Sequence, residues 1–379
     1  MNSLIKKTAI RTLKILPINL QNTVIEQYLC YKKRKLGFLK TPTAVILYVT
    51  NKCNLRCGHC FYWQSLNQQS NELSLNEIDQ IANSLMHPIS LSLTGGEPFL
   101  RSDLRQLVDI FIKKGKVKEI GIASNGFMTD EIVSFCDHFC QEHGDIPLSI
   151  QISLDGMEST HDSIRKVKGS FKRALLTLER LLKTKQQYSS FSVSAGIAVQ
   201  KKNLEEIPEV IDLLGAIGLE LRINLIRGET SGTFGITNDD SSHFNPKEGD
   251  DISLDLKEMR FLYNILCSKN EIYHFWTKRH KRIYEICMQV LETKKKIVDC
   301  YAGTIDCVIY SNGDVSFCEL TKPVGNLRDF GCNLEKLWSN SSAHAMRFKV
   351  KRCFCIHGCN ITTSLMFCPE IVKETIFKQ

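Results

Sequence analysis

Three cysteines are crowded into one short stretch of the chain, and no other side chains are better suited to chemistry. In TNKCNLRCGHCFYW, residues 50–63, Cys53, Cys57 and Cys60 follow one another with the spacing C-x3-C-x2-C directly after an apolar run. A structural zinc site normally takes four protein ligands from paired C-x2-C knuckles. Three thiolates in one loop suit an iron–sulfur cluster that keeps one iron open. The polar residues between the cysteines indicate an exposed loop, which argues against chance clustering of buried thiols.

The overall composition is consistent with metal-bound rather than disulfide-bonded cysteines. The chain has 379 residues and 16 cysteines, with 43% hydrophobic and 24% charged residues, as in an ordinary globular protein. Its first residues lack the apolar core and cleavage site of a signal peptide, and no run reaches the length of about 18 apolar residues that spans a bilayer. We therefore expect a cytoplasmic protein whose clustered thiols bind metal.

The positive charge of the chain is concentrated at its N-terminus. Residues 1–40 hold nine Lys and Arg against one acid, Glu26, which accounts for the whole net charge of +8. A basic face spread over the fold is therefore not indicated, and we expect no nucleic-acid partner. Apolar residues recur at helical spacing between the lysines of residues 3–16, and Pro17 ends that pattern before a second short helix. Residues 1–35 either pack on the fold as an ordinary helical arm or make a peripheral contact with a membrane surface.

The elements that must position the cysteine loop follow an alternating pattern. Short apolar runs separated by amphipathic stretches predict a parallel α/β fold, either an open sheet or a barrel. Several runs end in Gly, Asn, Asp or Arg, as expected at the carboxyl edge of the strands, where such folds bind ligands. A polar stretch at 229–251 predicts a mobile lid or surface excursion, and residues 253–296 predict helices. The six predicted strands are 44–50, 89–96, 119–126, 148–156, 191–200 and 220–228.

The three-cysteine loop after the first predicted strand resembles the signature of the radical S-adenosylmethionine (radical SAM) superfamily. The resemblance implies a partial (β/α)6, TIM-like barrel and a [4Fe–4S] cluster on Cys53, Cys57 and Cys60. It also implies that the amino and carboxylate groups of S-adenosylmethionine (SAM) chelate the fourth iron. Electron transfer from the cluster then cleaves the sulfonium, and a 5′-deoxyadenosyl radical abstracts hydrogen from the substrate. One small departure is His59, where the family often has another aromatic residue, and we expect its ring near adenine rather than on iron.

Further matches lie at the ends of the following strands. TGGEP (94–98) resembles the Gly-Gly-Glu motif, in which the glycines let the backbone approach the cofactor and the glutamate pairs with its ammonium group. SNG (124–126) lies where family members contact ribose or the methionine moiety. SLDG (153–156), followed by Arg165, resembles the pair that binds the cofactor's carboxylate and ribose. The implied cofactor-binding residues are Gly95, Gly96, Glu97, Ser124, Asn125, Ser153, Asp155 and Arg165.

A second group of cysteines lies near the C-terminus. Cys300 and Cys318 flank two short predicted strands with an Asn-Gly turn at 312–313, and CFCIHGCNITTSLMFC follows at 353–368. Together with GNLRD (325–329) and LEKLW (334–338), this arrangement resembles the SPASM and twitch extensions of the superfamily, which carry auxiliary [4Fe–4S] clusters. The second half reads C-x1-C-x3-C-x8-C instead of the SPASM pattern C-x2-C-x5-C-x3-C, so the ligand set is open.

The resemblance implies at least one auxiliary [4Fe–4S] cluster in this region. We expect one on Cys300, Cys318, Cys355 and Cys359, with Cys353 as a substitute ligand. Cys307, Cys332 and Cys368 could complete a second cluster. A zinc site on the same thiols is the alternative, because four thiolates suit either metal.

These observations predict four regions and one main function. The regions are a basic arm (1–42), the radical SAM barrel (43–250), a helical connector (251–299) and a SPASM-like auxiliary module (300–379). We expect a radical SAM enzyme acting on a small-molecule or lipid-linked substrate, because residues 1–43 are too few for the added peptide-recognition domain of many relatives. The alternatives are a peptide-modifying SPASM enzyme and a non-catalytic iron–sulfur electron carrier. A reductase such as flavodoxin or ferredoxin is the implied electron donor, and no general base can be named; Glu319, Asp306 and Arg227 are pocket candidates by position only.

Overall fold

The structure is a computed structural model that describes residues 12–226, 232–242, 247–249 and 252–377. Within these ranges, nine strands form one sheet in the order β10-β9-β8-β1-β2-β3-β4-β5-β6. Strands β1 to β6 are all parallel. Strand β1 is apolar along most of its length, whereas β2, β3 and β4 alternate buried apolar residues with more exposed ones. Their bounds are β1 Ala44–Thr50, β2 Ser90–Gly95, β3 Glu119–Ser124, β4 Leu148–Ser153, β5 Phe191–Val199 and β6 Glu220–Leu225.

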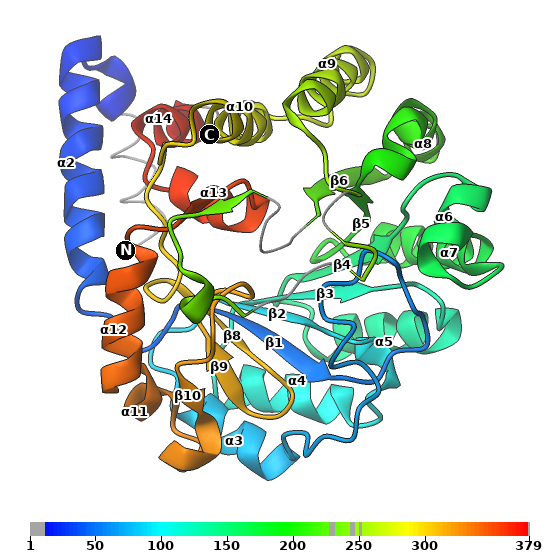
Figure 1. Cartoon of the computed structure of the whole chain (residues 1–379), viewed down its shortest axis with the longest axis horizontal. Coiled ribbons are helices and arrows are strands. Elements are labelled where there is room, and N and C mark those ends of the chain that lie inside the picture. The colour runs from blue at the N-terminus through cyan, green and yellow to red at the C-terminus, as the bar shows by residue number, and fades with distance from the viewer. Residues whose placement is uncertain (1–11, 227–231, 243–246, 250–251, 378–379) are drawn as a thin grey trace.

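The helices between these strands cover the outer face of the curved sheet (Figure 1). Each buries one apolar stripe; α4, for example, buries Leu104, Leu107, Val108 and Phe111. The first of them, α3, is capped at its N-terminus by Ser74, whose side chain and that of Glu77 form a reciprocal capping box. The bounds are α3 Leu75–Asn83, α4 Leu104–Lys113, α5 Thr129–Glu142, α6 Glu158–Arg165, α7 Ser170–Gln187 and α8 Ile207–Ala216, with 3-10 turns at Pro98–Leu100 and Lys201–Glu206.

The C-terminal region extends the same sheet on the other side of β1. Strand β8 (Asp306–Ile309) pairs parallel with β1, and β9 (Asp314–Ser316) and β10 (Gly325–Asn326) follow antiparallel. The predicted hairpin between Cys300 and Cys318 is therefore present. Helices α9 and α10 fill the predicted helical stretch, and four shorter helices follow the hairpin. These elements are α9 Leu256–Tyr273, α10 Lys278–Thr293, α11 Leu334–Trp338, α12 Ser341–Val350, α13 Gly358–Leu365 and α14 Pro369–Phe377, with a 3-10 turn at Leu327–Phe330.

The described parts of the polar stretch 229–251, expected to be a mobile lid or a surface excursion, pair with two other parts of the chain. Strand β7 (Thr233–Phe234) pairs antiparallel with β11 (Phe354–Cys355), and the rings of Phe234 and Phe354 stack at 5.3 Å. A 3-10 turn follows at Asn238–Asp240. The backbone N–H of Glu248 donates to the Gly58 carbonyl in the cysteine loop at 2.9 Å. This stretch therefore joins the barrel to the C-terminal cysteines.

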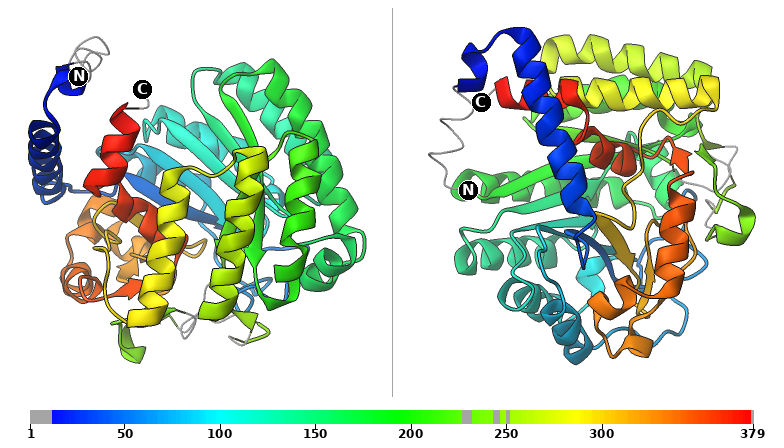
Figure 2. Two further views of the ribbon diagram at one scale, coloured as in Figure 1. Left: turned by 90° about the horizontal axis from the view of Figure 1, so that it is seen from above. Right: turned by 90° about the vertical axis from the view of Figure 1, so that its left-hand side faces the viewer.

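Helix α2 (Ile18–Leu36) is longer than the second short helix expected from the sequence, because it continues through the basic run Lys32–Lys35. It packs on α14 at the outside of the molecule, as Figure 2 shows. The contact stripe is Ile25 and Leu29, against Val372, Ile376 and Phe377. The expected helix over 3–16 falls mostly outside the described residues. Among those described, no helix combines the length and apolarity needed to cross a membrane.

The fold class predicted from the sequence is confirmed. Each predicted strand is present, with β1 at its predicted bounds and the others one to three residues shorter. The mostly parallel sheet covered by helices is consistent with a partial TIM-like barrel. Its carboxyl edge gathers the loops in which the predicted site residues lie.

Candidate active site

The cysteine loop leaves the carboxyl end of β1 and is fastened to the end of α6. The backbone N–H of Gly58 donates to the Ile164 carbonyl at 2.9 Å, and that of Arg56 to the Arg165 carbonyl at 3.4 Å. At the start of the loop, the side-chain amide of Asn67 accepts from the N–H of Cys53 at 3.0 Å and donates to its carbonyl at 3.1 Å. These bonds fix the backbone that carries the three thiols.

The three thiols lie close enough together to influence one another electrostatically. Burial raises the pKa of the Cys53 thiol to about 11 and that of Cys60 to about 12, and repulsion from the other thiols adds to both shifts. Burial also raises the pKa of Cys57, while the charge of Arg165 opposes the shift. Three thiolates here therefore need a cationic group such as iron to compensate them.

Within the described ranges, no three His, Cys, Asp or Glu side chains are arranged to hold a single metal ion. A four-iron cluster makes a different demand, because each thiolate binds a different iron atom.

Glu97 is buried directly beside this loop. One of its oxygens accepts from the Ser124 hydroxyl at 2.8 Å, and the other accepts from the N–H of Asn125 at 2.8 Å. Burial raises the pKa of Glu97 to about 7, although these hydrogen bonds favour its ionised form. The structure thus brings together the predicted Gly-Gly-Glu and SNG motifs around one carboxylate.

The two glycines before Glu97 are required by a close contact between backbones. A Cβ atom on Gly95 would lie 2.4 Å from the Thr50 carbonyl oxygen, and one on Gly96 would lie 2.0 Å from that of Lys52. The N–H groups of Gly96 and Glu97 donate to the same two carbonyls, each at 2.8 Å. The glycines therefore allow the motif to pack closely against the start of the cysteine loop. That their backbone also approaches a cofactor stays a prediction.

The predicted pair Asp155 and Arg165 is present and reaches the thiols. A carboxylate oxygen of Asp155 lies 2.5 Å from Nη2 of Arg165, and Nη1 of Arg165 donates to the Cys57 sulfur at 3.6 Å. Burial disfavours the ionised Asp155, but the charge of Arg165 outweighs it and holds the pKa of Asp155 below its usual value. Nε of Arg165 is buried with no hydrogen-bond partner among the described residues. Ser153 ends β4 two residues before Asp155.

His59 lies beside the same carboxylate, with its Nε2 3.8 Å from an oxygen of Asp155. Burial lowers the pKa of His59 to about 4, so its ring is neutral near pH 7. A place for this ring near adenine stays a prediction.

Several site residues carry no motif and were missed from the sequence. The amide of Asn125 donates to Asn54 in the cysteine loop at 2.7 Å, and His161 accepts from the N–H of Asp155 at 3.0 Å. Glu206 accepts from the N–H of Met157 at 2.8 Å and so holds the turn after β4. Nε2 of Gln200, a buried side chain after β5, has no hydrogen-bond partner in the described part of the chain. Such single residues are not distinguishable in a sequence from ordinary polar loop residues.

The C-terminal cysteines also come together. Burial raises the pKa of Cys300 well above its usual value, and repulsion from Cys355, Cys318 and Cys353 adds to the shift. Asn360 of α13 donates to the sulfurs of both Cys318 and Cys355, at 3.5 and 3.7 Å. Cys359 is near enough to Cys355 to contribute to the raised pKa of the Cys355 thiol, which burial chiefly raises to about 12.

The cysteines considered for a second auxiliary cluster and the three pocket candidates are spread over other parts of the fold. Cys307 is buried within β8, whereas Cys332 follows the 3-10 turn near Arg328. Asp306 pairs with Ala44 at the amino end of β1, so it lies at the edge of the sheet opposite to the cysteine loop. Glu319 is buried and accepts from the Tyr48 hydroxyl at 2.9 Å. Arg227 lies outside the described residues.

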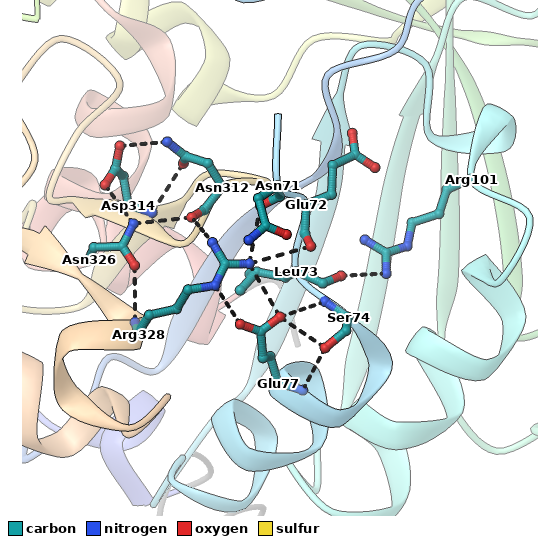
Figure 3. Close-up of polar contacts among 10 residues, drawn as sticks. All are labelled: Asn71, Glu72, Leu73, Ser74, Glu77, Arg101, Asn312, Asp314, Asn326 and Arg328. Carbon is teal, nitrogen blue, oxygen red and sulfur yellow. Dashed lines mark hydrogen bonds and ion pairs between the residues drawn. The ribbon is translucent and has the colours of Figure 1, made fainter. Parts of the chain in front are cut away.

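A polar network joins the C-terminal region to residues 71–77, the segment that leads into α3 (Figure 3). Nε of Arg328 donates to Glu77 of α3 at 2.5 Å, and its Nη1 donates to the Asn312 carbonyl at 2.7 Å. Its Nη2 reaches the carbonyls of Asn71 and Glu72 at 3.1 and 3.4 Å.

The neighbouring residues of this segment reach the end of β1. The carboxylate of Glu72 accepts from the Thr50 hydroxyl at 2.7 Å and from the N–H of Asn51 at 2.9 Å. Arg101 donates to the carbonyls of Val49 and Leu73, at 2.7 and 2.8 Å.

Comparison with known proteins identifies the domain that contains this site. Residues 47–214 match the family model described as the radical SAM superfamily. This range holds the three-cysteine loop, Glu97, Asp155 and Arg165.

Two curated relatives come from Methanosarcina barkeri. Fe-coproporphyrin III synthase is 32% identical over 185 residues, which cover 47% of this chain and 43% of that protein. AdoMet-dependent heme synthase is 27% identical over 320 residues, which cover 81% of this chain and 84% of that protein. The first alignment thus spans less than half of its relative.

Among solved structures, SuiB of Streptococcus suis bound to its precursor peptide SuiA has the same fold. The TM-score is 0.60 at 16% identity, and the match covers 84% of this chain and 69% of SuiB. The relatives that the chain resembles include SPASM-type members. Residues 47–214 of the chain therefore form a radical SAM domain.

Proposed function

We propose that this chain is an enzyme that cleaves SAM reductively and uses the 5′-deoxyadenosyl radical to take a hydrogen atom from a small-molecule or lipid-linked substrate. The observation that carries the proposal is the meeting of three groups at one edge of the sheet. These are the three-thiol loop, the buried Glu97 carboxylate, and the Asp155–Arg165 pair, whose arginine donates to the Cys57 sulfur. A non-catalytic electron carrier would need the thiols but not the carboxylate and the charged pair.

The superfamily implies a [4Fe–4S] cluster and SAM as cofactors, and the described residues fit both. Cys53, Cys57 and Cys60 would hold the cluster, which with SAM bound supplies the electron and the radical chemistry. Glu97 would accept the ammonium group of SAM, since its carboxylate is held by neutral donors and has no cation paired with it in the described residues. Arg165 would bind the carboxylate of SAM through guanidinium N–H groups that do not already contact Asp155 or Cys57.

We infer a separate auxiliary iron–sulfur cluster on the C-terminal cysteines. Three of its ligands would be Cys300, Cys318 and Cys355. The charges of Cys318 and Cys355 raise the pKa of the Cys300 thiol after burial, and Asn360 donates to the sulfurs of Cys318 and Cys355. The fourth ligand is Cys359, with Cys353 as the substitute; after burial, Cys359 contributes to the raised pKa of the Cys355 thiol and Cys353 to that of the Cys300 thiol. A zinc site on these thiols is the alternative.

The substrate class is supported by relatives of two kinds. The heme synthase, aligned over 84% of its length, supports a small molecule. A peptide substrate is the second candidate, because SuiB has been solved with its precursor peptide. A reductase such as flavodoxin or ferredoxin would supply the electron. Peripheral membrane contact through residues 1–35, of which 12–35 are described, would suit a lipid-linked substrate.

The test is anaerobic reconstitution with iron, sulfide, SAM and dithionite, followed by mass spectrometry of 5′-deoxyadenosine. Cell extract from deuterium-grown culture should transfer deuterium into 5′-deoxyadenosine. Transfer that survives protease treatment of the extract supports a small or lipid-linked substrate, and partition of the donor into organic solvent marks the lipid-linked case. Loss of transfer after protease treatment would favour the peptide instead. No 5′-deoxyadenosine above the enzyme-free level would contradict the proposal.

A further inference from the structure

The sheet has an inner face, opposite to the face that the helices cover. Successive side chains of a strand point to opposite faces of its sheet. The residues between the buried ones therefore point to the concave side of the curved sheet in Figure 1, which we call the inner face. In β2, β3 and β4 the set buried in the core between sheet and helices is Leu91, Leu93, Ile120, Ile122, Ile150 and Ile152.

Small and polar side chains line the inner face. Ser92 of β2 lies beside Gly121 of β3, and Gly121 lies beside Ser149 of β4. In the next row Gln151 of β4 lies beside Ser194 of β5. Within β2 to β5, all of which the structure describes, no residue on this face is aromatic or a large aliphatic. A closed TIM barrel fills this place with bulky branched side chains, so this barrel leaves room there for a ligand.

The inner face is accessible in the middle of the sheet. Ser92 and Ala123 are exposed although each lies in a strand with a neighbour on either side. Leu91, next to Ser92 but on the other face, is only 1% exposed. The hydroxyl of Ser194 is buried and has no hydrogen-bond partner among the described residues. Because buried polar groups are nearly always paired, an unpaired one on an accessible face indicates a ligand.

The inner face continues into the SAM site at the carboxyl edge of the sheet. Thr94 lies on this face directly before the Gly-Gly-Glu motif, and Ala123 lies on it directly before the SNG motif. On β4, Gln151 and Ser153 share the face, and Asp155 follows two residues later. A molecule bound on the inner face would therefore lie next to SAM. In this respect the inference rests on the proposed function.

The inner face offers hydrogen bonds but little charge. Across the described strands β2 to β5 its one ionisable residue is Glu119, at the amino edge. On β6, Glu220 and Arg222 continue the face and pair with each other at 3.6 Å. Away from the amino edge, a charged ligand group would lose its hydration without an unpaired opposite charge to replace it. Serine hydroxyls and the Gln151 amide both donate and accept, which suits hydroxyl groups on a ligand.

We propose that the inner face of β2 to β5 binds an uncharged, hydroxyl-rich part of the substrate, such as a sugar, through Ser92, Ser149 and Gln151. This chemistry is common to a free small molecule and to the head group of a lipid-linked one. A heme-like macrocycle, which the name of one relative suggests, would need the apolar and aromatic walls that this face lacks. An acyl chain would need the same walls and therefore stays outside the barrel.

The first experiment measures deuterium transfer from deuterium-grown cell extract to 5′-deoxyadenosine by the reconstituted full-length protein. The transfer rate is divided by the rate of SAM cleavage without extract, which corrects for any change in the SAM site. Ser92→Leu, which fills the accessible face with an apolar side chain, should abolish transfer. Ser92→Ala/Ser149→Ala removes two hydrogen-bonding groups of roughly fivefold each, so transfer at limiting extract should fall about 25-fold. The control is Ser134→Leu, an exposed serine of the outer helix α5, which should transfer like the wild type.

The second experiment tests the chemistry of the deuterium donor in the extract. Mild periodate treatment cleaves carbon–carbon bonds between adjacent hydroxyl groups, so it should destroy the donor once excess periodate has been quenched and removed. Partition between water and organic solvent then distinguishes a free from a lipid-linked molecule. A donor that survives periodate, or that is lost on protease treatment, would overturn the hydroxyl-rich group.

The inner-face site has its own contradicting result. Normalised transfer at the wild-type rate by Ser92→Leu would overturn it. If that variant does not fold, wild-type transfer by the double alanine variant would overturn it in the same way. Absence of 5′-deoxyadenosine from the wild type would instead contradict the proposed function, so the two failures are distinguishable.

Discussion

At the scale of single residues, Glu97 contacts both the SNG motif and the start of the cysteine loop. It accepts from Ser124 and Asn125, and its own N–H donates to the Lys52 carbonyl at the start of the cysteine loop. Its burial raises its pKa to about 7, so the carboxylate and the neutral acid are nearly balanced under ordinary conditions. A cation that pairs with Glu97 must displace the proton.

This balance predicts a pH dependence of SAM binding. Only the ionised Glu97 attracts the ammonium group, so binding releases a proton below pH 7, and the affinity should fall about tenfold per pH unit there and level off above it. Glu97→Gln removes a charge-assisted hydrogen bond of about 2 kcal/mol, which corresponds to roughly 30-fold weaker binding. Isothermal titration of the reconstituted protein from pH 6 to 8 measures both effects.

The matched control is Glu119→Gln, an exposed glutamate that begins β3. It should bind SAM like the wild type, with the same pH profile. An unchanged pH profile in Glu97→Gln would show that another group takes up the proton.

At the scale of elements, the network around Arg328 links the hairpin β8–β9 to the loop that carries the first thiols. Arg328 holds the 71–74 segment, and Glu72 in that segment holds the backbone of Asn51, two residues before Cys53. Arg328 also holds the pKa of Glu77 at about 2 through hydrogen bonding and charge. The C-terminal region therefore supports the loop that would hold the SAM-binding cluster.

We predict that Arg328→Gln loosens this loop as well as the fold. Losing the paired bonds to Glu77 and the carbonyl contacts should cost about 2 kcal/mol of folding free energy. It should also lower the iron retained by the first cluster after gel filtration and broaden its electron paramagnetic resonance signal with SAM. Arg260→Gln, which breaks the exposed pair with Glu292 between α9 and α10 (3.0 Å), is the control. If both variants lose stability and neither changes the signal, Arg328 has a purely structural role.

The sequence predicted the elements that follow local patterns. The strands could be found because each is a short run of regularly placed apolar residues between helical stretches, and the motifs could be found because they follow strand ends. The pairing of β8 with β1 could not be found, since the partners Ala44 and Asp306 are more than 250 residues apart and neither strand shows which neighbour it takes. The same holds for Arg328 and Glu77, and for the Asn54–Asn125 contact. The stretch 229–251 was expected to be a mobile lid or a surface excursion, and its pairing with Phe354–Cys355 through the two-residue strand β7 could not be found from the sequence.

At the scale of the whole molecule, the cysteines expected to bind clusters form two groups on one continuous sheet. The first leaves the carboxyl end of β1, and the second surrounds the hairpin that extends the sheet beyond β1. Two groups predict two independent clusters rather than one shared site.

The independence of the second group can be measured on a variant that lacks the first. Cys53→Ala/Cys57→Ala/Cys60→Ala should remain brown after reconstitution and keep about four irons, because the auxiliary cluster needs four thiolates that this change leaves in place. Adding Cys300→Ala and Cys318→Ala should remove this iron. A colourless triple variant with stoichiometric zinc would establish the zinc alternative for the C-terminal thiols.

The central claim is that SAM is cleaved at the three-cysteine loop. The most direct measurement is 5′-deoxyadenosine formed from SAM and dithionite by the reconstituted protein, quantified by mass spectrometry. The wild type and Cys30→Ala, which changes an exposed cysteine of α2, should both form it. Cys53→Ala/Cys57→Ala/Cys60→Ala should form none above the enzyme-free level, and 5′-deoxyadenosine produced by this triple variant at the wild-type rate would contradict the account.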